Sequence, residues 1–157
     1  MPVTTESLVE TWLIHNRINL YLLDGVAADG LPAVSASRGR TVGEQFAHVH
    51  NVRLMWLTQA APDLLQGLEK VEKTAAADRK ALRRSLEASG KAVASLLETS
   101  ATGDGRVKGF KPHVAAFLGY LISHESHHRG QIALTLKQAG MPLDKRVAYG
   151  LWEWGVR

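Results

Sequence analysis

Apolar residues recur three and four positions apart along four long stretches of this chain, and no other feature of the sequence limits its fold as strongly. This spacing places apolar side chains along one side of an α-helix, whereas the two-residue alternation of a β-strand is not convincing anywhere. Segments rich in glycine and proline separate the four stretches and are typical of loops. The sequence therefore predicts four helices, over residues 5–28, 41–60, 77–99 and 112–139.

Local signals set the ends of these predicted helices. Thr41 and Glu44 have the spacing of a capping box, Pro112 suits the first turn of the fourth helix, and Gly140 suits a left-handed cap after it. The last residues, KRVAYGLWEWGVR, have helical spacing over a short length. We therefore predict an all-α fold, an antiparallel four-helix bundle with a short C-terminal helical segment, as a single domain over residues 1–157.

The composition excludes several classes of function. Because the sequence contains no cysteine, it offers no disulfide, thiolate metal ligand or cysteine nucleophile, and any metal must be bound by His, Asp or Glu. The net charge is +4, but basic residues mostly alternate with acidic ones, so we expect no nucleic-acid partner. The densest basic group is interpreted as a solvated helical face: Arg79, Lys80, Arg83 and Arg84.

Neither a membrane span nor a signal peptide is predicted. No stretch approaches the roughly 18 consecutive apolar residues of a spanning helix. The start, MPVTTESLVETW, lacks the basic and then apolar order of a signal peptide. We therefore expect a cytoplasmic protein with no membrane association.

The segment HESHHRGQI, residues 124–132, is rich in metal-binding side chains. At 100° per residue, His128 lies about 40° from His124, and both fall in the middle of the apolar stripe of the predicted helix. Two imidazoles four residues apart on one face can bind one ion. The alternative is a pair of ordinary core histidines, each kept neutral and hydrogen-bonded. His127 lies about 60° to the other side, so we place it at the rim of the site.

A metal site needs further ligands, and the predicted second helix offers one. His48 shares its side with Val52 and Trp56, whereas His50 points about 200° away, so His48 is the better third ligand. Three neutral imidazoles leave coordination positions open, which is the layout of a catalytic site. They suit zinc, nickel, iron and copper alike. His15 and His113 are expected to lie at the surface or beside the ligands.

HESHH also matches the zinc-peptidase pattern H-E-x-x-H, with Glu125 as the general base. The extended form of that pattern is absent, because Gly130 follows His128 by two residues rather than three. Glu153 is a possible downstream ligand, but no edge strand is predicted for an extended substrate, and His48 is left unused. A peptidase is therefore the weaker interpretation.

Taken together, the sequence resembles the DinB family, the damage-inducible, YfiT-like four-helix metalloproteins. The resemblance covers nearly the whole chain: HNRINLYLLDGV, TVGEQFAHVHNVRLMWL, HESHHRGQIALTLKQAGMP and the terminal LWEW. It implies that the metal ligands are His48, His124 and His128, that the ion is zinc, nickel, iron or manganese, and that the protein is a homodimer. Relatives that use low-molecular-weight thiols, such as bacillithiol transferases and mycothiol-dependent isomerases, imply a thiol-dependent S-transferase or isomerase with a small-molecule substrate.

In a chain without cysteine, such a reaction needs a cofactor thiol, whose pKa falls when it binds a metal ion. Arg129, Lys108 and Lys111 are candidates for binding a carboxylate of the thiol or substrate, and solvated cations are the simpler interpretation. Glu44 and Glu125 are candidates for orienting a ligand imidazole. A metal-dependent hydrolase of small substrates and a non-catalytic metal-binding stress-response module remain alternatives.

Overall fold

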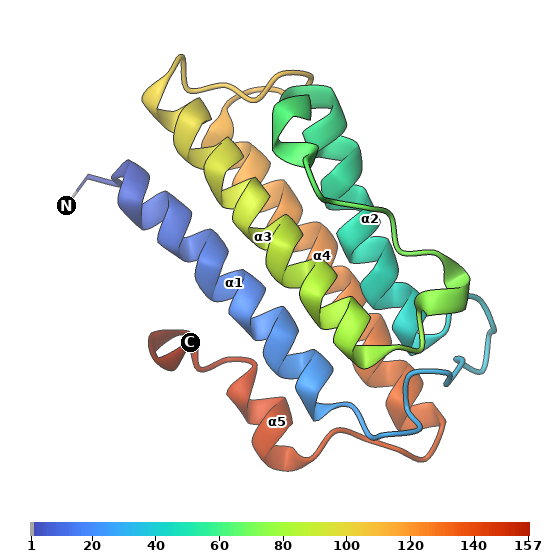
Figure 1. Cartoon of the computed structure of the whole chain (residues 1–157). Helices are drawn as coiled ribbons and strands as arrows, with labels where there is room; N and C mark the ends of the chain where they lie inside the picture. The colour runs from blue at the N-terminus through green and yellow to red at the C-terminus, as the bar shows by residue number, and fades with distance from the viewer. Residues whose placement is uncertain (1) are drawn as a thin grey trace.

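The computed structural model describes residues 2–157 and consists of four long helices with short helical segments (Figure 1). The long helices are α1 (Thr5–Gly25), α2 (Val42–Ala60), α3 (Arg79–Thr102) and α4 (Val114–Gln138). A short α5 (Lys145–Gly150) and three 3-10 turns complete the described chain: η1 (Pro62–Leu65), η2 (Lys73–Ala75) and η3 (Trp154–Val156). The predicted all-α bundle with a C-terminal helical segment is confirmed.

The helix ends agree with the sequence signals in two cases and differ in one. At the start of α2, Thr41 Oγ1 accepts from the Glu44 backbone N at 3.1 Å, and Glu44 Oε2 accepts from the Thr41 backbone N at 2.9 Å, so the capping box is confirmed. Gly140 has a φ of 75° just after α4. The first-turn position of Pro112 was wrong, because His113 caps α4: its Nδ1 accepts from the Ala116 backbone N at 3.1 Å.

The chain directions depend on the long connection between α2 and α3. In Figure 1, α1 and α4 run one way while α2 and α3 run the other, because residues 61–78 return along the bundle. Among the neighbouring helices, α1 with α3 and α2 with α4 are therefore antiparallel, whereas α2 with α3 and α1 with α4 are parallel. The connection is held by Asn51, whose amide exchanges hydrogen bonds of 2.9 and 3.0 Å with the backbone of Val71. The His50 ring also bonds the Glu69 carbonyl at 2.8 Å.

A layer of buried polar side chains divides the interior into two apolar clusters. One cluster includes Trp12, Leu57, Leu97 and Phe117. The other cluster includes Leu22, Phe46, Leu86 and Leu136. Along each helix, buried polar positions fall between the residues of the two clusters, and they are His15, Asn16, Asn19, Arg53, Ser89, Glu125 and His128; the buried Gln45 lies beside this layer, within the second cluster. This layer lies at the level of the candidate site.

One of the four basic residues interpreted as a solvated face has a structural role. The Arg79 guanidinium donates to the carbonyls of Leu23, Val26 and Ala27, which lie at the C-terminal end of α1. A cation is favourable there because the last carbonyls of a helix lack helical partners and carry partial negative charge. The interpretation of Arg79 as solvated was therefore wrong.

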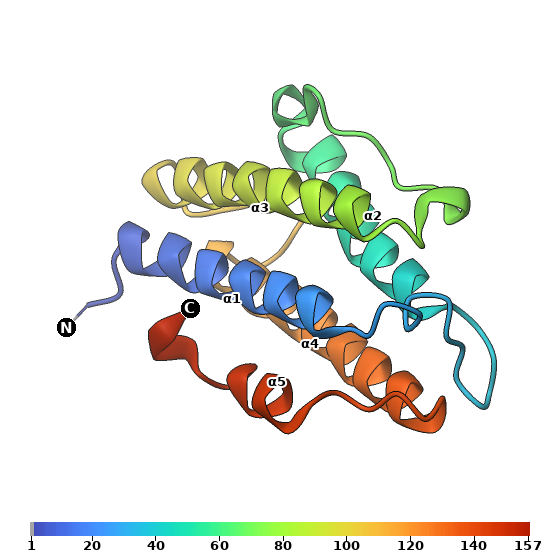
Figure 2. The same ribbon diagram turned by 60° about the horizontal axis from the view of Figure 1, so that its bottom comes forward.

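The C-terminal segment runs back beside α1 (Figure 2). The Arg157 guanidinium lies 3.7 Å from the centroid of the Tyr21 ring, and Arg17 Nη2 donates to the Arg157 carbonyl at 3.0 Å.

Between residues 2 and 157, none of the helices combines the length and the apolar character needed to cross a membrane.

Candidate metal centre

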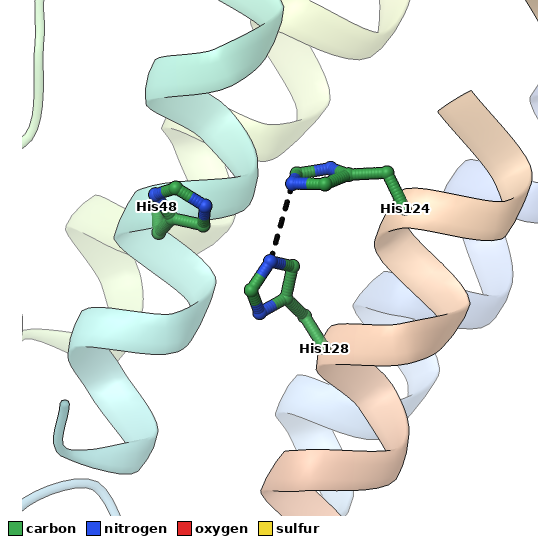
Figure 3. A group of neighbouring side chains, drawn as sticks. All are labelled: His48, His124 and His128. Carbon is green, nitrogen blue, oxygen red and sulfur yellow. Dashed lines mark hydrogen bonds between the residues drawn. The ribbon is translucent and has the colours of Figure 1, made fainter. Parts of the chain in front are cut away.

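The structure brings the three predicted metal ligands together between two antiparallel helices. His48 extends from α2 toward His124 and His128, which lie one turn apart on α4 (Figure 3). One ring nitrogen of each residue lies within 4.8 Å of the corresponding nitrogen of the other two. His128 is buried, and His48 and His124 are partly exposed. The group is therefore accessible from solvent while one ligand is fixed in the interior.

The spacing of the two nitrogens on α4 and the chemistry of all three ligands fit a divalent ion. His124 Nε2 and His128 Nε2 are 3.2 Å apart. Two nitrogens that each lie about 2.0–2.1 Å from one tetrahedral ion are about 3.3 Å apart, so this pair already has the required separation. Imidazoles suit several transition metals. His48, His124 and His128 would thus hold the ion, and three protein ligands leave at least one coordination position open.

Gln45 sets the orientation of His128. His128 Nδ1 lies 2.6 Å from Gln45 Oε1, and both side chains are buried. Because the amide oxygen only accepts, Nδ1 carries the proton, and the lone pair of Nε2 faces the other two histidines. Gln45 was not among the residues predicted from the sequence. The signal was available, because a polar side chain three residues before His48 shares the inward side of α2 with Phe46 and Val49.

We expect Gln45→Leu to weaken metal binding by about 10–100-fold, because the His128 imidazole loses the partner that fixes its tautomer and ring orientation. Competition with a chromophoric chelator measures this affinity. The matched control is Gln45→Glu, which keeps an acceptor for Nδ1 and should bind at least as tightly as the unmodified protein. Equal affinities for Gln45→Leu and the unmodified protein would show that Gln45 has no such role.

The three imidazoles are neutral at neutral pH. Burial lowers the pKa of His128 to about 4, with further contributions from the charges of His124, His48 and His127. Burial also lowers the pKa values of His48 and His124, and the Arg40 charge adds to both shifts. A metal ion therefore meets little competition from protons at these nitrogens at pH 7.

The same shifts predict how the stability of the metal-free protein depends on pH. In the unfolded chain, histidines titrate near pH 6.5, whereas in the folded protein the pKa values of His15, His48, His50, His124 and His128 are all lower. Below pH 6.5 the unfolded state therefore binds more protons, and the free energy of unfolding should fall as the pH decreases toward 4. Urea titrations at pH 7.5, 6.5 and 5.5 measure this slope. A free energy of unfolding that stays constant or rises as the pH is lowered from 7.5 to 5.5 would contradict the lowered pKa values of these histidines.

Glu125 does not face the metal ligands. Its carboxylate accepts from Arg53 Nε at 2.7 Å and from Arg53 Nη2 at 2.8 Å. It also accepts from Asn19 Nδ2 at 2.7 Å and lies 2.8 Å from His15 Nε2. Arg129 Nη1 approaches the other ring nitrogen of His15 at 3.3 Å, which places the His15 proton on Nε2, directed at Glu125.

These contacts remove Glu125 from the role of general base. Burial alone would raise the pKa of Glu125, but the Arg53 charge and the hydrogen bonds from Arg53 and His15 outweigh it and hold that pKa below its ordinary value. Because this carboxylate is buried, ionised and already engaged by four donor groups, it is poorly placed to take the proton of a water molecule at the metal site. The zinc-peptidase interpretation therefore lacks the general base that it requires. The orienting role expected for Glu125 also differs from the structure, because its histidine partner is His15 and not a metal ligand.

The other candidate side chains are used elsewhere. The Arg129 guanidinium bonds Asn19 Oδ1 at 2.7 Å and Ser126 Oγ at 2.9 Å, so it is directed at α1 and at its own helix. Lys108 and Lys111 line a cavity in the connection before α4, together with Asp104 and Arg106. Glu44 caps α2 and lines a cavity shared with Arg40 and His48. The structure therefore brings neither Arg129 nor these lysines to the three histidines.

The remaining histidines and Glu153 take separate positions. His15 is fully buried, so a surface position for it was wrong. His127 is exposed on α4, with its ring 5.1 Å from that of His128, which agrees with a rim position. His113 is an exposed helix cap. Glu153 bonds Arg157 at 3.4 Å in the C-terminal segment, away from the group of three histidines.

Comparison with known proteins gives one match. The model of the family described as the DinB family matches residues 1–150 of the 157-residue chain. The corresponding comparisons with curated proteins and with solved structures found no match.

Proposed function

The chain belongs to the DinB family, and we propose that it is a metal-dependent enzyme that transfers or isomerises small molecules by means of a low-molecular-weight thiol. The observation that carries this proposal is the convergence of three neutral imidazoles, from α2 and α4, at a position open to solvent. A saturated structural site would need a fourth protein ligand. His48, His124 and His128 are the only such group found in residues 2–157.

A divalent ion bound there would supply Lewis acidity, lowering the pKa of a coordinating thiol so that the thiolate is available at neutral pH. The residues of the chain would bind the ion and orient its ligands. Gln45 fixes the His128 ring, and the three imidazoles remain neutral donors. The positive charge of Arg40, which contributes to the lowered pKa values of His48 and His124, favours an anionic ligand beside them.

An aromatic cluster offers an apolar surface next to the ligands. The Tyr120 ring stacks on His124 with a centroid distance of 6.3 Å and an interplanar angle of 17°. Trp56 and Phe110 lie 5.6 and 5.4 Å from Tyr120. Tyr120 is partly exposed, so a hydrophobic part of the electrophilic substrate would pack against this cluster while its reactive atom faces the open side of the site.

The test is a panel of small thiols and electrophiles assayed with the metal-loaded protein. The proposal predicts turnover that requires both metal and thiol and that is lost in His128→Ala. The control variant is His127→Ala, which removes an exposed neighbouring imidazole and should retain turnover. Turnover no higher than that of His128→Ala would remove the thiol-dependent function. Metal-dependent cleavage of small esters or amides without any thiol would instead support the hydrolytic alternative.

We further propose that the protein is a cytoplasmic homodimer that acts on a small molecule. Family membership supports the dimer, since dimers are common in the family. Sedimentation equilibrium on the purified chain measures the assembly state, and a monomer at micromolar concentrations would contradict the dimer.

A further inference from the structure

The buried pair formed by Arg53 and Glu125 connects the same two helices that carry the metal ligands. Arg53 follows His48 by five residues on α2, and Glu125 is adjacent to His124 on α4. The exposed fractions of the two side chains are 0% and 1%. The guanidinium Nε and Nη2 donate to the two carboxylate oxygens at 2.7 and 2.8 Å, so the contact is a two-point fork and not a single ion pair.

The fork is held from the other two helices as well. Arg53 Nη1 donates to Asn16 Oδ1 at 2.8 Å on α1, and to the Leu86 carbonyl at 3.0 Å and Ser89 Oγ at 3.2 Å on α3. Asn19 and His15, both on α1, contact Glu125. The Arg53 guanidinium also lies 4.8 Å from the centroid of the Trp12 ring. Because every long helix contributes, neither charged group is free to change its position alone.

A buried ion pair is weak evidence for stability, because the desolvation of both charges offsets their attraction, and apolar residues of similar volume are often as stable. The effect that such a pair provides most clearly is structural register. Apolar side chains tolerate sliding of one helix against another, whereas a two-point fork breaks when either nitrogen–oxygen distance rises beyond about 3.5 Å. The chemistry of this pair therefore favours a role in alignment.

The alignment of α2 with α4 is what the metal site requires. Since the two helices are antiparallel, their contacts follow one another as Gln45 with His128, Arg53 with Glu125, and Trp56 with Tyr120. A slip of one residue would move His48 by about 1.5 Å along the bundle. Metal–ligand distances tolerate only about 0.2 Å, so such a slip would separate His48 from an ion held by His124 and His128.

We propose that the Arg53–Glu125 fork sets the register of α2 against α4 and so preorganises the three-histidine site. Arg53 and Glu125 are positioning residues: they act through the helices and do not touch the ion. The inference rests on the proposed metal binding. It assigns the glutamate of the HESHH segment a role unlike that of the catalytic base in a zinc peptidase.

The experiment compares zinc affinity, the cobalt absorption spectrum and urea stability in four proteins. They are the unmodified chain, Arg53→Met combined with Glu125→Leu, Arg53→Lys, and Leu97→Ala as a control in the apolar cluster around Trp12. The double variant should fold, yet bind zinc at least about 10-fold more weakly and give an altered cobalt spectrum. Leu97→Ala should unfold at lower urea but keep its affinity within about twofold and its spectrum.

Arg53→Lys decides the outcome if the double variant does not fold. Lysine keeps the charge but cannot form the fork, so affinity should again fall by several-fold. A folded double variant, or Arg53→Lys, with unchanged zinc affinity and cobalt spectrum would overturn the positioning role. Failure of the unmodified chain to bind any of zinc, cobalt, nickel, iron or manganese would instead refute the proposed metal site, and this result is obtained before any variant is compared.

Discussion

Arg53→Met is expected to lower the free energy of unfolding by about 3–5 kcal/mol, although it adds no volume to the core. The substitution removes the guanidinium that neutralises Glu125 and leaves that carboxylate buried, with only Asn19 and His15 as partners. It also leaves the acceptors on Asn16, Leu86 and Ser89 without their donor. Urea titration at pH 7 measures the change.

The control for this prediction is Arg83→Met. Arg83 is paired with Asp24 at 2.6 Å, but the two side chains are 39% and 52% exposed. Solvent screens such a pair, so its loss should cost less than about 1 kcal/mol. The two variants remove the same chemical group from opposite environments. Similar losses for both would contradict the claim that the Arg53–Glu125 pair is buried and fully hydrogen-bonded.

His128→Ala has the second large effect, the loss of metal binding. It removes the ligand that Gln45 orients and leaves His48 and His124, which come from different helices. We expect affinity for zinc to fall by more than about 100-fold, beyond the range for residues that only support a ligand. His127→Ala changes the neighbouring exposed histidine and should bind normally. Isothermal titration with both variants measures the difference, and equal affinities would exclude His128 as a ligand.

The four helices and the histidine pair of α4 were predictable because their signals are local. Apolar spacing places Phe117, Leu121 and Ile132 on one side of a helix, and His124 and His128 fall among them. The shared direction of α2 and α3 was not predictable, because it depends on how residues 61–78 return along the bundle. That return uses long-range contacts, such as Asn51 with the backbone of Val71, which leave no periodic pattern in the sequence.

The buried polar layer was missed for a different physical reason. His15 was expected at the surface or beside the ligands, and Arg53 was not identified, because polar residues are usually exposed unless they have partners. Their partners lie on other helices: Glu125 is 110 positions from His15 and 72 from Arg53. A signal for Arg53 was present, since it shares the buried side of α2 with Phe46, Val49 and Leu57. An arginine within an apolar stripe predicts a buried acidic partner.

The central claim is that His48, His124 and His128 bind one divalent ion, and elemental mass spectrometry of the untagged protein tests it most directly. Affinity tags of histidines must be avoided because they bind metal themselves. The site predicts about one zinc, nickel, iron or manganese ion per chain, lost in both His48→Ala and His124→Ala. The claim would be contradicted if the native protein were metal-free and took up no ion when metal is added, while both variants were folded and as stable as the unmodified chain.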